Sequence, residues 1–482
     1  MNKKKNNPYD RAYWFSEQLR ADSKLLDTRV SSLLDLLYEH SQLKRKRYKE
    51  HLPQLRTLVL NLLKASQTKP PSLTIPMSSD SYTAFERVSF KVLVKHHVET
   101  LVAMGWLSKH SGFRYGEQRR LTRLELLEPM LKWLKNIPVN ANDIERPAPK
   151  SSVLVKDEKK NVIQLPAAFD EELGRRQRRL SQVNEAFAKS FFDLFLSENE
   201  LEDLDGRMLG GAELDPDQPP FLDLSAKYLI RIFNNSSLEQ GGRFYRGWWQ
   251  NIPKEFRPLI CINGDFTTEM DYSAIHPTLL YALEGKEMPY EDPYVCGLLT
   301  EELRSVTKRA FNILLNAADR EQAVKAIRNQ SLLQNSSSNG IHDEQTLIDL
   351  IYDSHSLIGS YFGSGYGVKL QYLDSEIAEA VMLRMLPEPC LPVHDSFIVR
   401  VGQTSKLKQI MDEEFEAATG VKAGIKIKLL ELSDDRKRIV NELIDDELSG
   451  FSIRLNKWRK KHHWKFFVDG GTAYDVPQLT GR

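Results

Sequence analysis

Apolar residues recur in this chain with both strand and helix spacing, and the two patterns meet near residue 271. Residues 258–264 and 267–272 flank the pair Asn263-Gly264, which favours the positive φ of a tight turn, so they predict a β-hairpin. Over residues 275–283 the apolar positions recur every fourth residue, which predicts a helix packed on that hairpin. Asp271 is therefore expected at the end of a strand, directly before a helix.

A second hairpin is predicted around Asp395. Residues 390–394 enter it and residues 397–401 leave it, with Asp395 and Ser396 at its apex. Parallel placement of the two strand ends would bring Asp271 and Asp395 within reach of the same pair of oxygen-seeking cations. Such paired carboxylates are what two-metal phosphoryl transfer requires.

The segment before the second hairpin is predicted to be a helix. Apolar residues recur at helical spacing over 369–385. Asp374 and Glu376 are expected to be its N-terminal cap and first-turn acid, positions that the helix dipole favours.

Breaks in the pattern divide the chain into three parts. Residues 1–210 are predicted to be a mostly helical N-terminal region, with an extended linker at 68–76 and a hairpin at 151–166. A polar stretch rich in Gly and Pro closes this region, and a catalytic core is expected over 221–433. Residues 434–482 form a basic, aromatic C-terminal segment.

Composition alone does not indicate a partner. The 67 basic and 66 acidic residues give a net charge of only +1, so nucleic-acid binding requires a local concentration of positive charge. The three cysteines have no metal-ligand or disulfide spacing, which favours a reducing cytoplasm. No apolar run reaches the roughly 18 residues that span a bilayer, and no secretory signal is evident, so we expect a cytoplasmic location without membrane contact.

Three basic groups supply such local charge. Arg304 and Lys308 are four residues apart, so on a helix both can meet one triphosphate. Residues 240–253 mix glycine, arginine and aromatic residues around Arg243 and Arg246, which suits contacts to nucleic acid or triphosphate, although Trp248 and Trp249 could equally be core residues. Residues 457–467, with Lys457 and Arg459, suit backbone neutralisation and base stacking, or alternatively a helix packed on the core.

Three of these segments, in this order, resemble motifs of one polymerase superfamily. AspTyrSerAlaIleHis at 271–276 resembles the first palm motif of family A DNA polymerases. HisAspSerPhe at 394–397 resembles the third, in the form common among phage-type single-subunit RNA polymerases. Residues 304–312 resemble the fingers helix between them. Taken together, these motifs are more specific than any one of them alone.

The resemblance implies an α+β fold: a right-hand palm, built as an antiparallel sheet with helices, and reduced helical fingers, preceded by the mostly helical region in a thumb-like or nucleic-acid-binding role. It implies two Mg²⁺ ions, or Mn²⁺ in their place, bound by Asp271, Asp395 and the backbone carbonyl of Tyr272. The incoming nucleotide would meet four residues: Arg304, Lys308, His276 and Asn312. Template or primer would meet Arg243, Arg246, Gln371, His394, Lys457 and Arg459.

Two departures from the family pattern leave the product open. His276 occupies the place of the glutamate that excludes the ribose 2′-hydroxyl in family A DNA polymerases, and Asn312 and Ile313 stand where the fingers helix usually presents an aromatic residue and glycine. The sequence therefore predicts a nucleic-acid polymerase that is template-directed, with DNA or RNA as product. Two alternatives remain: a template-independent or priming nucleotidyltransferase, and a catalytically silent palm-fold protein that binds nucleic acid.

Overall fold

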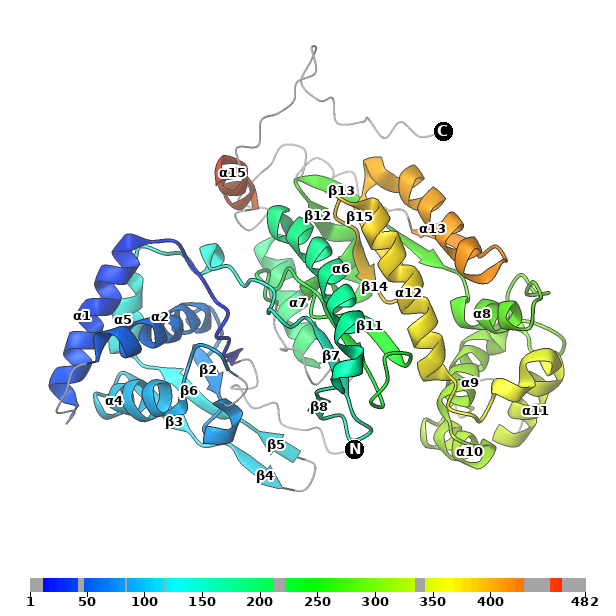
Figure 1. Ribbon diagram of the computed structural model, residues 1–482, viewed down its shortest axis with the longest axis horizontal. Coiled ribbons are helices and arrows are strands. Elements are labelled where there is room, and N and C mark those ends of the chain that lie inside the picture. Colours follow the sequence, from blue (N-terminus) through cyan, green and yellow to red (C-terminus); the bar gives the residue numbers. More distant parts are fainter. Residues whose placement is uncertain are drawn as a thin grey trace, which may run out of the picture.

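The computed structural model describes residues 12–41, 47–82, 85–115, 118–210, 222–333, 343–428 and 451–461. In this part of the chain the large hydrophobic cores are two, one built by residues from Tyr13 to Ile144 and the other by residues from Val153 to Phe415. We call residues 12–146 the N-terminal unit and residues 147–428 the central unit. They lie side by side in the ribbon diagram (Figure 1).

The N-terminal unit combines a sheet with helices, so the prediction of a mostly helical region missed half of its architecture. Its sheet has the order β1-β2-β6-β3, formed by Tyr13–Trp14, Ser72–Ile75, Thr122–Leu126 and Leu107–His110. The predicted linker at 68–76 contains β2, whose side chains are all buried between its two neighbours. In short strands flanked by prolines, the alternation of apolar and polar residues is too brief to be recognised from sequence.

Helices cover this sheet and close the N-terminal core. They are α1 (Lys24–His40), α2 (Tyr48–Ala65), α3 (Phe90–Val92), a π-helical segment (Leu93–Val98), α4 (Glu99–Ala103) and α5 (Glu128–Lys135). A separate hairpin, β4 (Phe113–Tyr115) with β5 (Gln118–Arg120), extends from the unit (Figure 1).

The main sheet of the central unit is antiparallel and has β13 at its centre. Its path is β14 (Leu391–Val393), β15 (Ser396–Arg400), β13 (Asp265–Tyr272), β12 (Ile260–Ile262) and β9 (Phe192–Leu194), and β16 (Ile425–Lys428) also pairs with β13. The predicted hairpin at Asn263-Gly264 is confirmed: it joins β12 to β13, and both turn residues have positive φ, 57° and 97°.

A second sheet stands beside the first. Its order is β11 (Gly241–Tyr245), β10 (Ile230–Phe233), β7 (Val153–Lys156) and β8 (Val162–Ile163), and β7 with β8 is the hairpin predicted at 151–166. Because β7 and β9 pair with strands that follow residue 221, the hydrophobic cores divide between Ile144 and Val153 and not at the predicted boundary near 210.

Helices pack on these sheets and extend beyond them. The helices that pack on the two sheets are α6 (Asp170–Lys189), α7 (Glu198–Gly210), α8 (Ile275–Leu283), α12 (Gly367–Met385) and α13 (Thr404–Thr419). The helices α9 (Arg304–Asn316), α10 (Arg320–Asn329) and α11 (Glu344–Ser354) gather at the end of the molecule farthest from the N-terminal unit (Figure 1). The expected α+β class is therefore confirmed.

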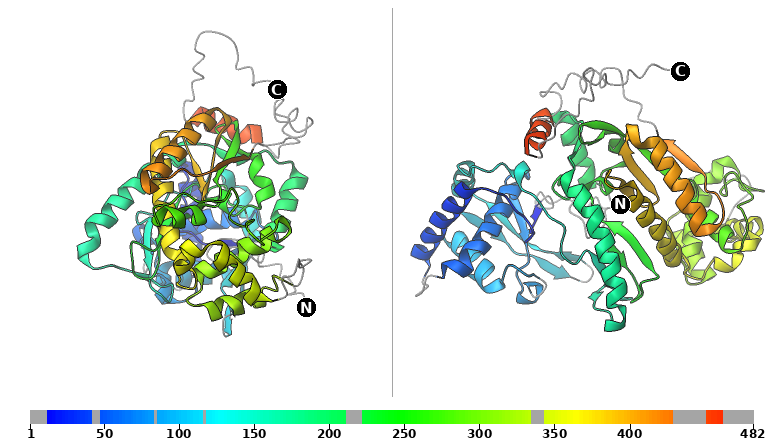
Figure 2. Two further views of the ribbon diagram at one scale, coloured as in Figure 1. Left: turned by 90° about the vertical axis from the view of Figure 1, so that its right-hand side faces the viewer. Right: turned by 45° about the horizontal axis from the view of Figure 1, so that its top comes forward.

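The last described element is α15 (Phe451–Lys461), which lies near the junction of the two units (Figure 2). Phe451, Leu455 and Trp458 pack against Phe191 and other residues behind the main sheet. The alternative that residues 457–467 form a helix packed on the core is therefore confirmed for residues 457–461; residues 434–450 and 462–482 lie outside the described residues. Within the described ranges, every helix is too short or too polar to cross a lipid bilayer.

Candidate active site

The antiparallel pairing of β13 with β15 brings the two predicted aspartates together. Asp271 lies opposite Ser396 in the ladder, and the Tyr272 amide donates a hydrogen bond of 3.2 Å to the carbonyl oxygen of Asp395. The expected parallel placement is wrong: the end of β13 meets the start of β15 because the strands run in opposite directions.

The turn that presents Asp395 is tighter than predicted. Val393 pairs with Ser396, so the apex is His394-Asp395, and Ser396 already belongs to β15. His394 has φ +59°, as the first residue of a two-residue hairpin turn often requires. A positive φ is uncommon for a residue other than glycine, and such conformations gather at functional sites.

Burial and the neighbouring Asp395 raise the pKa of Asp271. The side chain of Asp271 is still 28% exposed, so an ion from solvent can reach it. Lys428 opposes the shift: its Nζ lies 3.4 Å from Asp271 Oδ2 and 2.8 Å from Glu269 Oε1. The ammonium therefore partly neutralises the carboxylates of Asp271 and Glu269.

Strand alternation directs the side chain of Asp271 away from the helix α13. Met270 and Tyr272 are buried, and the Tyr272 hydroxyl donates a 2.7 Å hydrogen bond to the Met411 carbonyl on α13. Asp271 and Glu269 therefore face the opposite side. Because the Tyr272 side chain is engaged with α13, only its backbone carbonyl is left for the predicted metal contact, which stays a prediction.

Beside the carboxylates lies a polar triad in which the buried Asp374 bonds the half-buried Arg243 and His276. His276 Nε2 is 2.9 Å from Asp374 Oδ2, and Arg243 Nε donates to Asp374 Oδ1 at 3.1 Å. Burial opposes the charged form of Asp374, but the hydrogen bond from His276 and the charge of Arg243 outweigh it and lower the pKa of Asp374. The triad joins three elements: β11, α8 and α12.

The prediction that Asp374 and Glu376 cap a helix is wrong. The helix begins earlier, at Gly367, so Asp374 lies two turns inside it. Glu376 pairs with the buried Arg231, whose Nη1 also donates to Glu379 at 2.8 Å.

Arg243 connects the triad to the aspartates. Burial lowers the pKa of Arg243, whereas Asp374 and, more weakly, Asp395 raise it, and the rise prevails. The predicted site residues Arg243, His276, Asp271 and Asp395 therefore belong to one neighbourhood.

The helix α9 presents its predicted residues in one stripe. Arg304, Lys308 and Asn312 follow one another at intervals of four residues, and Lys308 and Asn312 are exposed. Arg304 Nε bonds to Asp292 at 2.6 Å, and both cations lie 5.8 Å from the ring centre of Tyr294. Burial, then the charges of Asp292 and Asp395, raise the pKa of Tyr294. Tyr294 therefore contacts the stripe and feels the charge of Asp395.

The other residues predicted to bind nucleic acid are not all near the two aspartates. Gln371 is half-buried on α12, three residues before Asp374; His394 is exposed beside Asp395; and Arg246, φ +87°, directly follows β11. Arg459 lies beside Gly264, which precedes the other end of β13. Asp265 and Asp271 are six residue steps apart along that strand, or about 20 Å. Lys457 pairs with Asp143 of the N-terminal unit. The structure thus separates α15 from the aspartates.

The two adjacent tryptophans are core residues. Trp248 and Trp249 are 3% and 0% exposed, and Trp249 Nε1 donates to the Pro392 carbonyl at 3.0 Å. Since Pro392 lies in β14, this bond fixes the hairpin that carries Asp395.

Sequence reasoning missed several members of the site. Glu269 is two residues before Asp271, so strand alternation could have placed both on one face; Ser396 Oγ donates to it at 2.8 Å. Lys428 and Tyr294 had no such signal. They reach the site only through the pairing of β16 with β13 and through the packing of α9.

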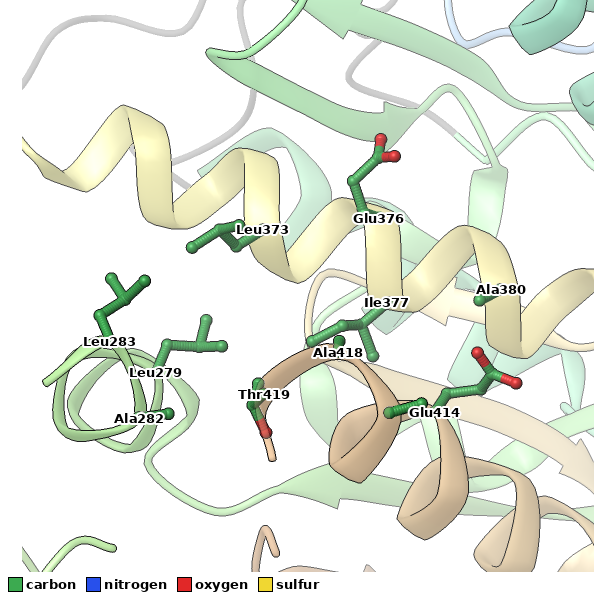
Figure 3. A pocket seen from close by; sticks show the side chains of 11 residues that line it. Leu279, Ala282, Leu283, Leu373, Glu376, Ile377, Ala380, Glu414, Ala418 and Thr419 are labelled. Atoms are coloured by element: carbon green, nitrogen blue, oxygen red, sulfur yellow. The ribbon is translucent and has the colours of Figure 1, made fainter. Parts of the chain in front are cut away.

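A hollow of about 400 Å³ lies apart from the two aspartates. It is lined by α8, α12 and α13, with Leu279, Ile377 and Ala418 among its side chains (Figure 3). Neither aspartate lines it, so this hollow is not the candidate active site.

The donor set fits a hard cation. Two carboxylates and a backbone carbonyl are oxygen ligands of the kind that Mg²⁺ prefers, with water and substrate phosphates completing its shell. In the described ranges Asp271 and Asp395 do not form a group of three ligating side chains, so a magnesium ion here would depend on such additional oxygens.

Comparison with known proteins gives a weak match. No protein-family model matches the chain, and no curated protein matches it. Among solved structures, the chain is similar to the POL domain of Pol1 from M. smegmatis in complex with DNA primer-template and dNTP, with a TM-score of 0.28 and 10% sequence identity. The match covers 85% of this chain and 66% of that one. Because this likeness is weak, the site geometry has to carry any functional proposal.

Proposed function

We propose that this chain is a nucleic-acid polymerase, a nucleotidyltransferase that adds nucleotides to a 3′-hydroxyl at Asp271 and Asp395. The observation that carries the proposal is the pairing of β13 with β15, which sets these carboxylates side by side on the face of the sheet opposite to α13. Burial and the negative charge of Asp395 raise the pKa of Asp271, and a divalent cation would relieve the repulsion between the two carboxylates.

In this proposal Asp271, Asp395 and the Tyr272 carbonyl hold Mg²⁺. When bound, such ions would lower the pKa of the primer hydroxyl and would stabilise the charge on the pyrophosphate. The protein itself positions the reactants, because phosphoryl transfer needs little covalent chemistry from side chains.

The stripe on α9 would bind the triphosphate. Lys308 is exposed and, among the described residues, its ammonium contacts only the Tyr294 ring, so it is available to a phosphate. Arg304 already has Asp292 as a partner and would share its guanidinium between the carboxylate and the nucleotide.

The triad beside the aspartates would contact the sugar and the growing strand. Asp374 fixes the imidazole of His276, so a large, oriented ring stands at the position where the resemblance expects sugar discrimination. Arg243 is held by the same carboxylate and would meet template, primer or triphosphate.

One observation favours the catalytically silent alternative. Lys428 bridges Glu269 and Asp271, so its ammonium supplies positive charge where a metal ion is proposed. A palm that binds nucleic acid without catalysis would keep such a bridge. A polymerase would displace it when magnesium and nucleotide bind.

Incorporation of labelled nucleotides tests the proposal. Labelled dNTPs and NTPs are offered separately, with Mg²⁺, on primed, unprimed and template-free nucleic acid. Asp395→Asn should abolish incorporation, whereas Asp353→Asn, which changes an exposed carboxylate on α11, should not. The substrate used then identifies the product and template class. Absence of incorporation under every condition, together with nucleic-acid binding, would establish the silent alternative.

A further inference from the structure

The N-terminal unit holds three buried histidines that the proposed polymerase does not use. His51 lies in the first turn of α2, and His96 and His97 lie in the π-helical segment Leu93–Val98. Their exposed fractions are 5%, 7% and 0%. Over the described ranges, they are the one group of three or more metal-ligating side chains whose ligand atoms lie close together, within 4.8 Å of one another.

The tautomer of His97 is set by the backbone. Its Nε2 lies 3.2 Å from the carbonyl oxygen of His51, and a carbonyl can only accept, so Nε2 carries the proton. Nδ1 therefore carries the lone pair. A ring N–H donated to a backbone carbonyl is the usual outer contact of a metal-binding histidine, because it fixes both tautomer and ring orientation.

The spacing of the imidazole nitrogens matches a shared ion. His96 Nδ1 lies 3.2 Å from His97 Nδ1. Zinc–nitrogen bonds of about 2.0–2.1 Å place two tetrahedral ligands roughly 3.3 Å apart. The His51 ring stands edge-on to both others, with centroids 4.6 Å and 5.3 Å away, so a small rotation brings its nitrogen into the same sphere.

A hydrogen bond between His96 and His97 would still leave two buried nitrogen atoms of the cluster without a hydrogen-bond partner. His51 Nδ1 and His96 Nε2 are buried without a hydrogen-bond partner in the part of the chain that the structure describes. Buried polar atoms normally have partners, and each exception calls for an explanation such as an ion. An ion among the three rings supplies the missing partner of His51.

We propose that His51, His96 and His97 bind a transition-metal ion, with Zn²⁺ as the first choice, and that the ion fastens the π-helical segment to α2. Three imidazoles suit zinc, cobalt, nickel or copper and not magnesium, which prefers oxygen. Single-turn π segments occur often at functional sites, and this one places two adjacent histidines against one partner helix. The proposal rests on the N-terminal unit alone and is independent of the polymerase assignment.

The test uses the full, untagged chain after dialysis against a chelator. Co²⁺ titration should produce the visible absorption of a tetrahedral site with three nitrogen ligands and a water molecule, at about one ion per chain. Zn²⁺ should then remove that absorption by competition and raise the unfolding temperature. Absence of stoichiometric cobalt binding to the folded chain would overturn the proposal, as would a thiolate charge-transfer band, because the ion would then be bound by cysteine.

Two substitutions locate the ion. His51→Gln should remove the cobalt absorption, and His40→Gln, which changes an exposed histidine of α1, should leave it unchanged. If His97→Gln does not fold, His51→Gln and the unmodified chain still decide the question. Cobalt binding by folded His51→Gln that equals that of the unmodified chain would contradict the assignment.

Discussion

Asp271 and Asp395 repel each other when no cation lies between them, and burial makes this repulsion more costly. If both hold magnesium, either substitution Asp271→Asn or Asp395→Asn removes several kcal/mol of transition-state stabilisation, which is at least about a thousandfold in rate. Single-turnover incorporation measures this loss. Circular dichroism should show an unchanged fold, and a variant that keeps a tenth of the activity would remove the metal assignment.

Lys428 affects the pKa of Asp271. Because its ammonium lowers the pKa of Asp271, Lys428→Met should raise that pKa further. Metal binding needs the ionised carboxylate, so the acid limb of the pH–rate profile should move to higher pH in the variant. The measurement is incorporation against pH at subsaturating Mg²⁺. Lys422→Met, which changes an exposed lysine before β16, is the matched control, and coincident profiles of Lys428→Met and the unmodified chain would contradict this role.

The stripe on α9 allows a test at the scale of one helix. Lys308→Ala should raise the KM for the nucleotide by roughly tenfold or more, since it removes a charge-assisted bond to phosphate. Arg309→Ala removes an exposed cation one residue along, on another side of the helix, and should change the KM little. Equal effects of the two substitutions would show a general charge effect and move the triphosphate site elsewhere.

The helix α12 is fastened to the second sheet by buried charge. Arg231 is fully buried and donates to Glu379, which is 3% exposed and also bonds Arg179. Removing one partner of a buried pair costs about 3–5 kcal/mol, so Glu379→Ala should lower the free energy of unfolding by that amount. Urea denaturation measures it. Glu413→Ala breaks a half-exposed pair with Arg384 and should lower the free energy of unfolding by only about 0–1 kcal/mol. Equal losses in the two variants would show that the buried charges do not stabilise the fold more than an exposed pair does.

Local signals predicted elements well where one short segment contains all the information. The turn at Asn263-Gly264 and the helix at 367–385 follow from positive φ and apolar spacing within a few residues. The direction of β15 against β13 could not be predicted, because strand pairing depends on the path of the chain between them. The role of Asp374 was missed for the same reason, since Arg243 reaches it from another sheet.

At the scale of the whole molecule, sequence breaks proved a weak guide to the units. The polar stretch near 210 suggested a boundary, yet residues 153–194 belong to the central unit by strand pairing. The N-terminal sheet was missed because its first strand has only two residues. The sequence did not reveal the contacts between the units either, and among the described residues the buried Asp223 makes several of them.

Asp223 joins the two units through residues that are far apart in sequence. Its carboxylate accepts a 3.1 Å hydrogen bond from the Tyr13 hydroxyl and pairs with Arg146 at 3.1 Å and Lys64 at 3.4 Å, all from the N-terminal unit. Burial works against the charged carboxylate, but Arg146 and Lys64 outweigh it and hold the pKa of Asp223 well below its usual value. Asp223→Asn should therefore cost about 3–5 kcal/mol at neutral pH and separate the unfolding of the two units in calorimetry.

The sign of the pH dependence follows from that lowered pKa. A carboxyl whose pKa falls on folding stabilises the folded chain above its unfolded pKa, about 3.9, and loses this contribution as the pH drops below it. The difference in the free energy of unfolding between the unmodified chain and Asp223→Asn should therefore be constant near neutral pH and become smaller in acid. Asp203→Asn, which breaks an exposed pair with Arg207, should show little gap at any pH. A gap that persists unchanged below pH of about 3 would mean that packing, and not the charge of Asp223, holds the units together.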